Sequence, residues 1–401
     1  MKFLIIEQDL RVSGTSQGII SRSFLSKLRM AKPHSIIDVV YLKQYASDDQ
    51  LELLPVNSIQ EHILDLKIPF TVKWFNKIYW RLFHVSLKEQ YIHKTYGSYI
   101  AKIDFEQYDH IFIRSAGLEH ETILGSKDLP ILKRAVLTFH EPYPVFWCAG
   151  TQNSLSNLEL FRLKKMQEVV SQAKCGMANA LLSEDLSYLY GSKKKFYVLP
   201  HQYSKDIFDF TDTSQVFNKE KKITISYHGA IQFGRDVMIL LDAYRALLET
   251  NSKFKDETEF ILRVKGINIK FLKERYAAIP NIIILDTVNF SNSAFEQIHL
   301  TDINVILENG PLYCNILVGK APFLASFNKP VFSLSPERSE MRRIIKDEQF
   351  IAQCNDKEEI KEKLENLIIN RMVTDEPVYP FGDYFTDENF TKLLDKVLNV
   401  Q

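Results

Sequence analysis

The sequence lacks most features that would assign it to a specialised class of protein. Its four cysteines are scattered without Cys-x-x-Cys spacing, which argues against a disulfide framework and against a cysteine zinc site. Fifty basic residues balance fifty acidic ones, so no bulk charge favours a nucleic-acid partner. No window approaches about 18 consecutive apolar residues, the length of a membrane-spanning helix. The first residues show no basic flank before a long apolar run, so we expect no signal peptide and a cytoplasmic protein.

Recognisable catalytic motifs are also missing. We find no Gly-x-Ser-x-Gly, His-Glu-x-x-His or Gly-x-x-x-x-Gly-Lys-[Ser/Thr] motif. Asp-x-Asp does not occur either, so no carboxylate pair is available for a metal-bridged diphosphate. We therefore expect neither a metal nor a resident cofactor.

Short apolar runs alternate with helical patterns along almost the whole chain. Most of these runs are continuous, as expected of parallel strands covered on both faces. The predicted strands are Phe3–Ile6, Ser35–Tyr41, His110–Arg114, Ala135–Phe139, Cys175–Ala178, Phe196–Leu199, Ile223–Tyr227, Phe260–Val264, Ile282–Leu285, Ile303–Leu307 and Val331–Leu334. The alternation predicts an α/β fold with two Rossmann-like, doubly wound parallel sheets.

A polar segment divides this pattern into two halves. Residues 203–222 are rich in Asp, Ser, Thr and Lys and show no strong period, which is typical of a hinge. We predict an N-terminal domain over residues 1–204 and a second domain over residues 205–378. Residues 379–401 carry an amphipathic helix that we expect to pack back on the N-terminal domain.

One region combines aromatic and basic side chains. Trp74 and Trp80 are interleaved with Lys73, Lys77 and Arg81. Aromatic residues bordered by cations suit a membrane interface or a lipid-linked substrate, which would make the protein peripheral at the inner leaflet. The alternative is a helical pair whose aromatic side chains are buried in a core. The neutral charge of the chain argues against base stacking on RNA.

Two polar loops of the N-terminal half follow predicted strands. Gly14 and Gly18 would let backbone N–H groups approach a ligand at the end of the first strand. The loop lacks Gly-x-Gly-x-x-Gly, so it does not predict NAD binding. His140 follows Ala135–Phe139 directly and could act as an acid, a base or a donor to a sugar hydroxyl. A turn without a ligand and a structural histidine remain the alternative interpretations.

Two cations precede predicted helices in the second half. Gly229 follows one strand and Arg235 comes just before the next helix, where a phosphate is readily held. Lys320 comes before a short helix, Pro322–Phe327, within the segment 315–336. A pair of cations at two such loops is what a diphosphate needs, whereas a solvent-exposed lysine in an ordinary helix–strand unit is the alternative.

The full chain resembles GT-B glycosyltransferases of the family 4-like ("group 1") kind. The similar segments occur in the family's order: the loop with Gly14 and Gly18, Thr138-Phe-His140-Glu, Val198-Leu-Pro200-His, Gly229 to Ala243, Leu300-Thr-Asp302-Ile, and Lys320 to Pro330. The resemblance implies a nucleotide-sugar donor in the second domain, an acceptor in the first, and no metal. It makes Arg235 and Lys320 the diphosphate ligands and His140 a contact near the transferred sugar.

The sequence departs from this family at two positions of the donor site. Phe323 stands where the family usually has a glutamate for the donor ribose, and Asn315 stands where many members have a carboxylate near the sugar. Glu308 and Asn309 are candidates for replacement polar contacts. The main hypothesis is a metal-independent transferase that acts on a glycan or lipid-linked glycan in surface polysaccharide biosynthesis. The departures leave two alternatives, a catalytically impaired scaffold that partners another transferase and a sugar-nucleotide epimerase.

Overall fold

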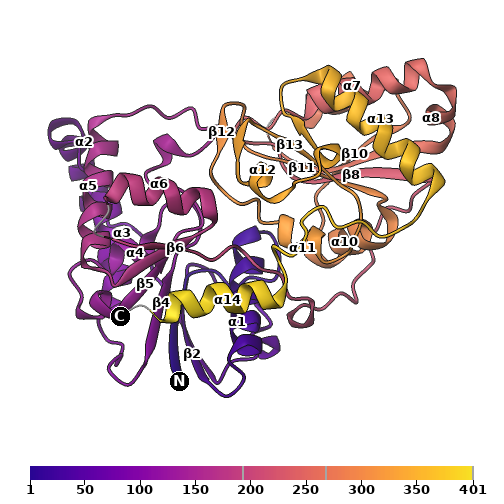
Figure 1. The fold of residues 1–401 in the computed structure, drawn as a ribbon. Coiled ribbons are helices and arrows are strands. Elements are labelled where there is room, and N and C mark those ends of the chain that lie inside the picture. The colour runs from indigo at the N-terminus through magenta and orange to yellow at the C-terminus, as the bar shows by residue number, and fades with distance from the viewer. Residues whose placement is uncertain (192–193, 267–268, 400–401) are drawn as a thin grey trace. The chain divides into compact units, whose positions relative to one another are not determined.

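The protein consists of two α/β units (Figure 1). The computed structural model describes residues 1–191, 194–266 and 269–399. Unit 1 comprises Met1–Ile207 with Thr386–Gln401, and unit 2 comprises Phe208–Phe385. The boundaries that we predicted from the sequence, 204/205 and 378/379, lie a few residues before these divisions.

Unit 1 contains a seven-stranded sheet in which every pairing is parallel. Its spatial order is β3-β2-β1-β4-β5-β6-β7. The strands are β1 (Lys2–Glu7), β2 (Ile36–Lys43), β3 (Ser58–Ile63), β4 (His110–Arg114), β5 (Ala135–Thr138), β6 (Cys175–Ala178) and β7 (Phe196–Val198). Continuous apolar runs explain the central strands, because residues 3–6 of β1 are buried on both faces of the sheet.

Unit 1 also contains α-helices. They are α1 (Ser16–Ala31), α2 (Phe70–Phe83), α3 (Leu87–Ile100), α4 (Glu121–Gly125), α5 (Asn157–Gln172), α6 (Ala180–Tyr190) and α14 (Asp387–Leu398). Local signals fix several starts: the Thr15 hydroxyl accepts a hydrogen bond from the N–H of Gln17 at α1. Within the part of the chain described, no helix combines the length and apolar character needed to cross a bilayer.

The C-terminal helix α14 packs on α1, as the sequence predicted (Figure 1). Phe390 of α14 is fully buried and its ring lies edge-on to that of Phe24, with 6.4 Å between centroids. An ion pair of 2.6 Å joins Lys32 to Asp395 beside this apolar contact. Val400, at the end of the predicted helix, lies outside the described residues.

Unit 2 contains a six-stranded parallel sheet of order β10-β9-β8-β11-β13-β15. Its strands are β8 (Ile223–Ala230), β9 (Thr258–Lys265), β10 (Ile282–Asp286), β11 (Ile303–Leu307), β13 (Val331–Ser335) and β15 (Ile351–Gln353). The α-helices are α7 (Val237–Thr250), α8 (Ser252–Glu257), α9 (Ile269–Arg275), α10 (Phe290–Phe295), α11 (Ala321–Ala325), α12 (Glu340–Ile344) and α13 (Lys357–Val373). A short pair, β12 (Tyr313–Cys314) and β14 (Arg338–Ser339), lies outside the sheet.

Both sheets share one topology. In each, the first strand of the unit lies between the second and the fourth, so the winding direction reverses between β1 and β4 and between β8 and β11. Loops at the carboxyl ends of such strand pairs diverge and leave a crevice, where open α/β sheets bind ligands. The topology therefore selects the loops after β1, β4, β8 and β11 as candidate sites.

The packing of α14 on α1 yields a stability prediction. Replacing Phe390 with alanine would leave a cavity against Phe24 and should lower the free energy of unfolding of unit 1 by about 3–5 kcal/mol. The matched control, Lys392→Ala, removes an exposed side chain from the same helix and should stay within about 0.5 kcal/mol of wild type. Chemical denaturation of both variants measures the difference, and equal stabilities would show that this contact contributes nothing.

Candidate functional site

The loops after β8 and β11 are held against each other in unit 2. The N–H of Gly310 donates to the carbonyl of Phe233 at 3.2 Å. Gly234 has a φ of +73°, and a Cβ there would lie 2.1 Å from the Gly310 carbonyl oxygen. Only glycine fits this approach, since a side chain would clash with the facing backbone.

Two hydrogen bonds hold the side chain of Arg235 in one orientation. Its Nε donates to Oδ1 of Asn309 at 3.0 Å, and its Nη1 donates to the carbonyl of Ala230 at 3.2 Å. The next residue, Asp236, caps α7 by accepting from the N–H groups of Met238 and Ile239. Arg235 is therefore fixed between the end of β8 and the start of α7, as its place in the sequence predicted.

Lys320 comes from a different loop and reaches the same strand end. Its Nζ donates to the carbonyl of His228 and lies 4.3 Å from the centroid of the Tyr227 ring. A Cβ built on Gly229 would be 3.2 Å from this Nζ. Gly229 thus leaves the space that the lysine side chain uses, and the structure brings Gly229, Lys320 and Arg235 together.

The two cations have only neutral partners. Neither Arg235 nor Lys320 forms an ion pair with a carboxylate anywhere in the described ranges. Burial, and to a smaller degree the nearby charge of Arg235, together lower the pKa of Lys320 to about 7. Like charges held close in a partly desolvated place are unfavourable, and an anion would relieve them. The arrangement is suited to binding a phosphate-bearing group.

The two residues after β11 have different roles. Asn309 holds Arg235, as described above, and is itself buried. Glu308 is also buried, and its Oε1 accepts from the N–H of Met341 in the first turn of α12. Burial raises the pKa of Glu308 to about 7. Asn309 therefore positions the cationic site, whereas Glu308 supports the start of a helix.

Two of the predicted donor contacts belong to the interior of unit 2. Phe323 is buried, and its ring packs against Phe290 and Phe327 with centroid separations of 5.5 and 4.7 Å. The Phe323 side chain therefore fills an aromatic cluster of unit 2, and its contact with a donor stays a prediction. Asn315 is fully buried as well and presents no exposed surface to a ligand.

The two glycines predicted at the first loop, Gly14 and Gly18, belong to unit 1. Gly14 has a φ of +80° and precedes Thr15, the cap of α1. Gly18 lies against the backbone of Arg11, since a Cβ at Gly18 would lie 2.2 Å from the Arg11 carbonyl oxygen. Gly18 is thus needed for close packing of helix and loop, and the approach of its backbone to a ligand stays a prediction.

His140 is buried beside a second histidine. Its Nδ1 lies 2.9 Å from Nε2 of His201. Burial, together with the charge of Arg114, lowers the pKa of His140 well below its ordinary value, and burial lowers that of His201 to about 3. Both imidazoles are therefore neutral at pH 7. The role of His140 near a transferred sugar remains a prediction. The next residue, Glu141, lines a polar cavity of unit 1.

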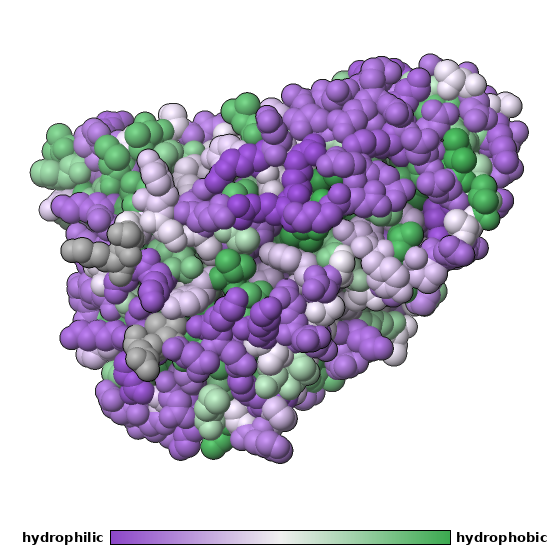
Figure 2. All heavy atoms as spheres, in the orientation of Figure 1, coloured by the Kyte–Doolittle hydropathy of each residue, from purple (hydrophilic) through white to green (hydrophobic). Residues whose placement is uncertain are grey.

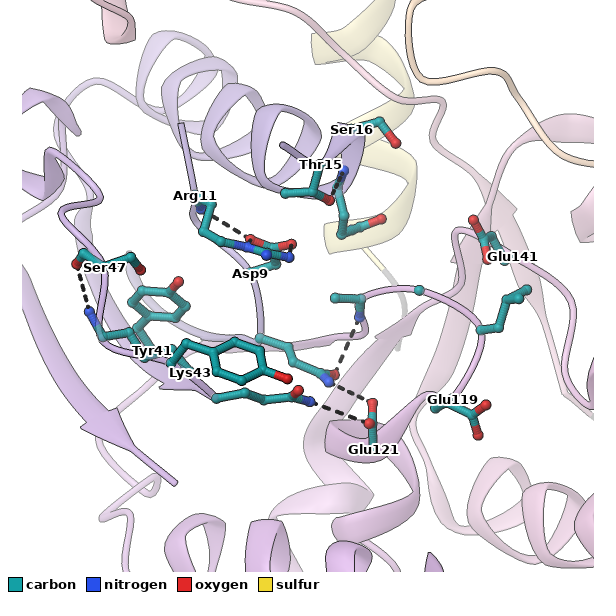
Figure 3. A pocket seen from close by; sticks show the side chains of 17 residues that line it. Asp9, Arg11, Thr15, Ser16, Tyr41, Lys43, Ser47, Glu119, Glu121 and Glu141 are labelled. Carbon is teal, nitrogen blue, oxygen red and sulfur yellow. Dashed lines mark hydrogen bonds and ion pairs between the residues drawn. The ribbon is translucent and has the colours of Figure 1, made fainter. Parts of the chain in front are cut away.

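Unit 1 carries a polar cavity of about 300 Å³ at the carboxyl ends of β1, β2 and β4 (Figure 3). Asp9 and Arg11 follow β1, Tyr41 and Lys43 end β2, and Glu121 begins α4 after β4. Figure 3 shows these side chains around one space, with Glu119 and Glu141 across from Arg11. The cavity lies where the winding of this sheet reverses.

The cations of this cavity are already paired. Arg11 binds Asp9 through two contacts, of 3.0 Å from Nε and 2.7 Å from Nη2. Lys43 pairs with Glu61 at 2.8 Å. Glu121 accepts from Nε2 of Gln8 at 2.5 Å, while burial raises the pKa of its carboxyl. The remaining lining is rich in carboxylate, hydroxyl and amide groups, so it suits a neutral ligand with many hydroxyls.

Sequence reasoning missed this cavity and the partners of the predicted residues. The sequence did not predict that His201 would contact His140 or that Asn309 would hold Arg235. Asp9 and Glu121 lie in the segments that follow the predicted strands Phe3–Ile6 and His110–Arg114, and polar residues in such segments are the signal that could have found them. In the described ranges, no group of three or more His, Cys, Asp or Glu residues is arranged to hold a metal ion.

Comparison with known proteins identifies the fold but no close relative. No family model and no curated protein matches the sequence. Solved structures of low sequence identity match nearly the whole chain. Sucrose-phosphate synthase from Thermosynechococcus elongatus aligns with a TM-score of 0.60 at 11% identity, over 99% of this chain and 95% of that one.

Two further structures align over 99% of both chains. An α,α-trehalose-phosphate synthase (UDP-forming) from Burkholderia xenovorans, in complex with glucose-6-phosphate, has a TM-score of 0.59 at 9% identity. The UDP-GlcNAc 2-epimerase from Neisseria meningitidis, bound to UDP-GlcNAc, has a TM-score of 0.56 at 13% identity. Together with the two parallel sheets, these alignments show that the chain has the GT-B fold.

Proposed function

We propose that this chain is a metal-independent glycosyltransferase that uses a nucleotide diphosphate sugar. The observation that carries the proposal is the convergence of Arg235 and Lys320 beside Gly229, where the winding of the unit 2 sheet reverses. Neither cation has a carboxylate partner among the residues described, so both are available to a diphosphate. The acceptor would be a glycan or lipid-linked glycan of surface polysaccharide biosynthesis.

The chemistry follows from where charge develops. In the transfer step the bond between the sugar's anomeric carbon and the diphosphate breaks, and the diphosphate keeps the electron pair. The anomeric carbon bonds to an acceptor hydroxyl oxygen, and the proton of that hydroxyl passes to the departing diphosphate. Arg235 and protonated Lys320 would stabilise the leaving diphosphate, in the way that preorganised cations stabilise developing negative charge. This replaces the charge that a metal ion supplies in other sites.

The fold-level neighbours support this class of donor. The trehalose-phosphate synthase is described as UDP-forming, and the Neisseria epimerase binds UDP-GlcNAc. Their identities to this chain are 9% and 13%, so they support a nucleotide-sugar user and not a particular base or sugar.

The cavity of unit 1 is the proposed acceptor site. Its side chains supply acceptors for sugar hydroxyls at Glu121 and Glu141 and hydrogen-bonding groups at Tyr41 and Gln44. Since Arg11 and Lys43 are neutralised by their own carboxylates, a phosphorylated acceptor would gain no cation there. We therefore propose an uncharged or amino sugar as the accepting unit, in contrast to the glucose-6-phosphate of the trehalose-phosphate synthase complex.

Removing either cation should slow turnover without unfolding the protein. Arg235→Gln and Lys320→Met should each lower kcat by roughly 100-fold or more, because each removes a donor from the leaving diphosphate. Lys346→Met, which changes an exposed lysine of the same unit, is the matched control. Rates are compared after thermal unfolding has confirmed folding. Wild-type rates in both site variants would refute the assignment.

The pKa of Lys320 predicts how donor affinity depends on pH. A diphosphate binds the protonated lysine, whose pKa is about 7 in the free protein. Above this pKa the dissociation constant of the donor should therefore rise, by about tenfold per pH unit, until the pKa of the complex is reached. Isothermal titration with a nucleotide sugar between pH 6 and pH 9 measures it. Lys320→Arg stays protonated and should give a flat profile, whereas a flat wild-type profile would contradict the role of Lys320.

Phe323 and Asn315 favour a second candidate function. Both are buried where the resembling family has carboxylates for the ribose and the sugar, so the chain could be a GT-B scaffold that no longer transfers sugar. Titration with UDP-, GDP-, CMP- and dTDP-linked sugars separates the two: the transferase should bind one of them, and a scaffold none at millimolar concentration. Epimerisation is tested by analysing the donor sugar after incubation without an acceptor.

A further inference from the structure

Helix α2 is exposed along its whole length. None of its fourteen residues is buried. Eight of them are large apolar side chains that are each more than 40% exposed, an unusual content for a surface helix. Figure 2 shows the corresponding hydrophobic cluster where Figure 1 places α2. The alternative in which these aromatic side chains form a core is therefore wrong.

The exposed residues of α2 form two parallel rows. Phe70, Trp74, Ile78 and Leu82 recur at every fourth position and make an apolar row along the helix. Lys73, Lys77 and Arg81 recur with the same spacing, and Arg81 and Lys77 border that row on one side. Apolar and aromatic side chains next to lysine and arginine are the composition of a helix that lies in a membrane interface.

All the charged residues of the segment 66–88, which contains α2, are cationic. Between Leu66 and Lys88 the sequence contains five lysine or arginine residues and no aspartate or glutamate. A symmetric dimer through this face would bring the same cations together, which is unfavourable. The surface of an anionic bilayer complements both rows. Its phosphate headgroups contact the cations, and the apolar row enters the acyl region.

A groove continues this surface between α2 and α3. It has a volume of about 550 Å³ and is lined by Thr71, Val72, Phe75, Tyr79, Leu87, Gln90, Tyr91 and Lys94. Like the two rows of α2, the groove combines apolar and aromatic side chains with a lysine. The groove therefore enlarges the apolar surface that a lipid could cover.

We propose that α2 docks this protein on an anionic phospholipid bilayer, lying flat in the interface with the groove covered by acyl chains. At 14 residues the helix is about 21 Å long, which suits the interface plane and is too short to span the hydrocarbon core. The proposal does not depend on the reaction proposed above, since binding to lipid is measured without substrate.

Vesicle co-sedimentation of the full-length protein tests this surface. Wild type should bind vesicles of mixed phosphatidylglycerol and phosphatidylcholine, and bind phosphatidylcholine alone far more weakly. Lys73→Gln/Lys77→Gln/Arg81→Gln should lower partitioning roughly 100-fold, about fivefold for each cation. Trp74→Ser/Ile78→Ser/Leu82→Ser should lower it at least about tenfold. Tyr188→Ser, which changes a residue that is 92% exposed on α6, is the control and should bind like wild type.

The outcomes are distinct. Loss of binding in both α2 variants, with unchanged thermal unfolding, supports the proposal. Equal binding by wild type and either variant overturns it, as does the absence of binding to anionic vesicles. Light scattering of wild type without lipid provides a second check: dimers that disappear in the Trp74/Ile78/Leu82 variant would assign the surface to self-association instead.

Discussion

The electrostatic tension between Arg235 and Lys320 organises the candidate donor site. Two cationic side chains reach one strand end from separate loops, and their hydrogen bonds are to an amide oxygen and to backbone carbonyls. Burial of Lys320, and to a smaller degree the charge of Arg235, lowers the pKa of this lysine. Folding holds the charges in place through Asn309, the glycine contact of the two loops and the cap of α7. Such preorganisation is useful when an anion is to be bound and then released.

The parallel sheets determine where such sites can form. In both units the strand order reverses direction between the first and fourth strands, so the loops that follow them border a crevice. Unit 2 presents unpaired cations there, while unit 1 presents carboxylates, hydroxyls and cations neutralised by their own partners. One topology thus yields two sites of different chemistry, suited to a diphosphate and to a neutral hydroxyl-rich ligand.

Local sequence signals predicted the elements that are buried on both faces. Strands such as His110–Arg114 and Ile303–Leu307 are mostly apolar, and the structure confirms their bounds. The edge strands β3 and β15 were not predicted. In β3 (Ser-Ile-Gln-Glu-His-Ile) most residues are exposed and the apolar run is absent, because an edge strand packs on fewer neighbours.

The candidate site also combines residues whose positions the sequence predicted with contacts that it did not predict. Gly229, Arg235 and Lys320 follow strands or precede helices, so their positions at one sheet edge could be predicted from the sequence. The role of Asn309 and the Gly234–Gly310 contact could not, since they depend on which loops the strand order brings together. Phe323 was placed at the donor site only because of its position in the segment that resembles the glycosyltransferase family. Its packing against Phe290 and Phe327 in the core of unit 2 could not be predicted from that position.

The central claim is that Arg235 and Lys320 bind the diphosphate of the donor. A crystal structure of the protein with a nucleotide diphosphate sugar at millimolar concentration tests it most directly. The account predicts that diphosphate oxygens lie within hydrogen-bonding distance of Lys320 Nζ and of the Arg235 guanidinium, beside Gly229. A nucleotide bound elsewhere, or one whose phosphates contact neither side chain, would contradict it.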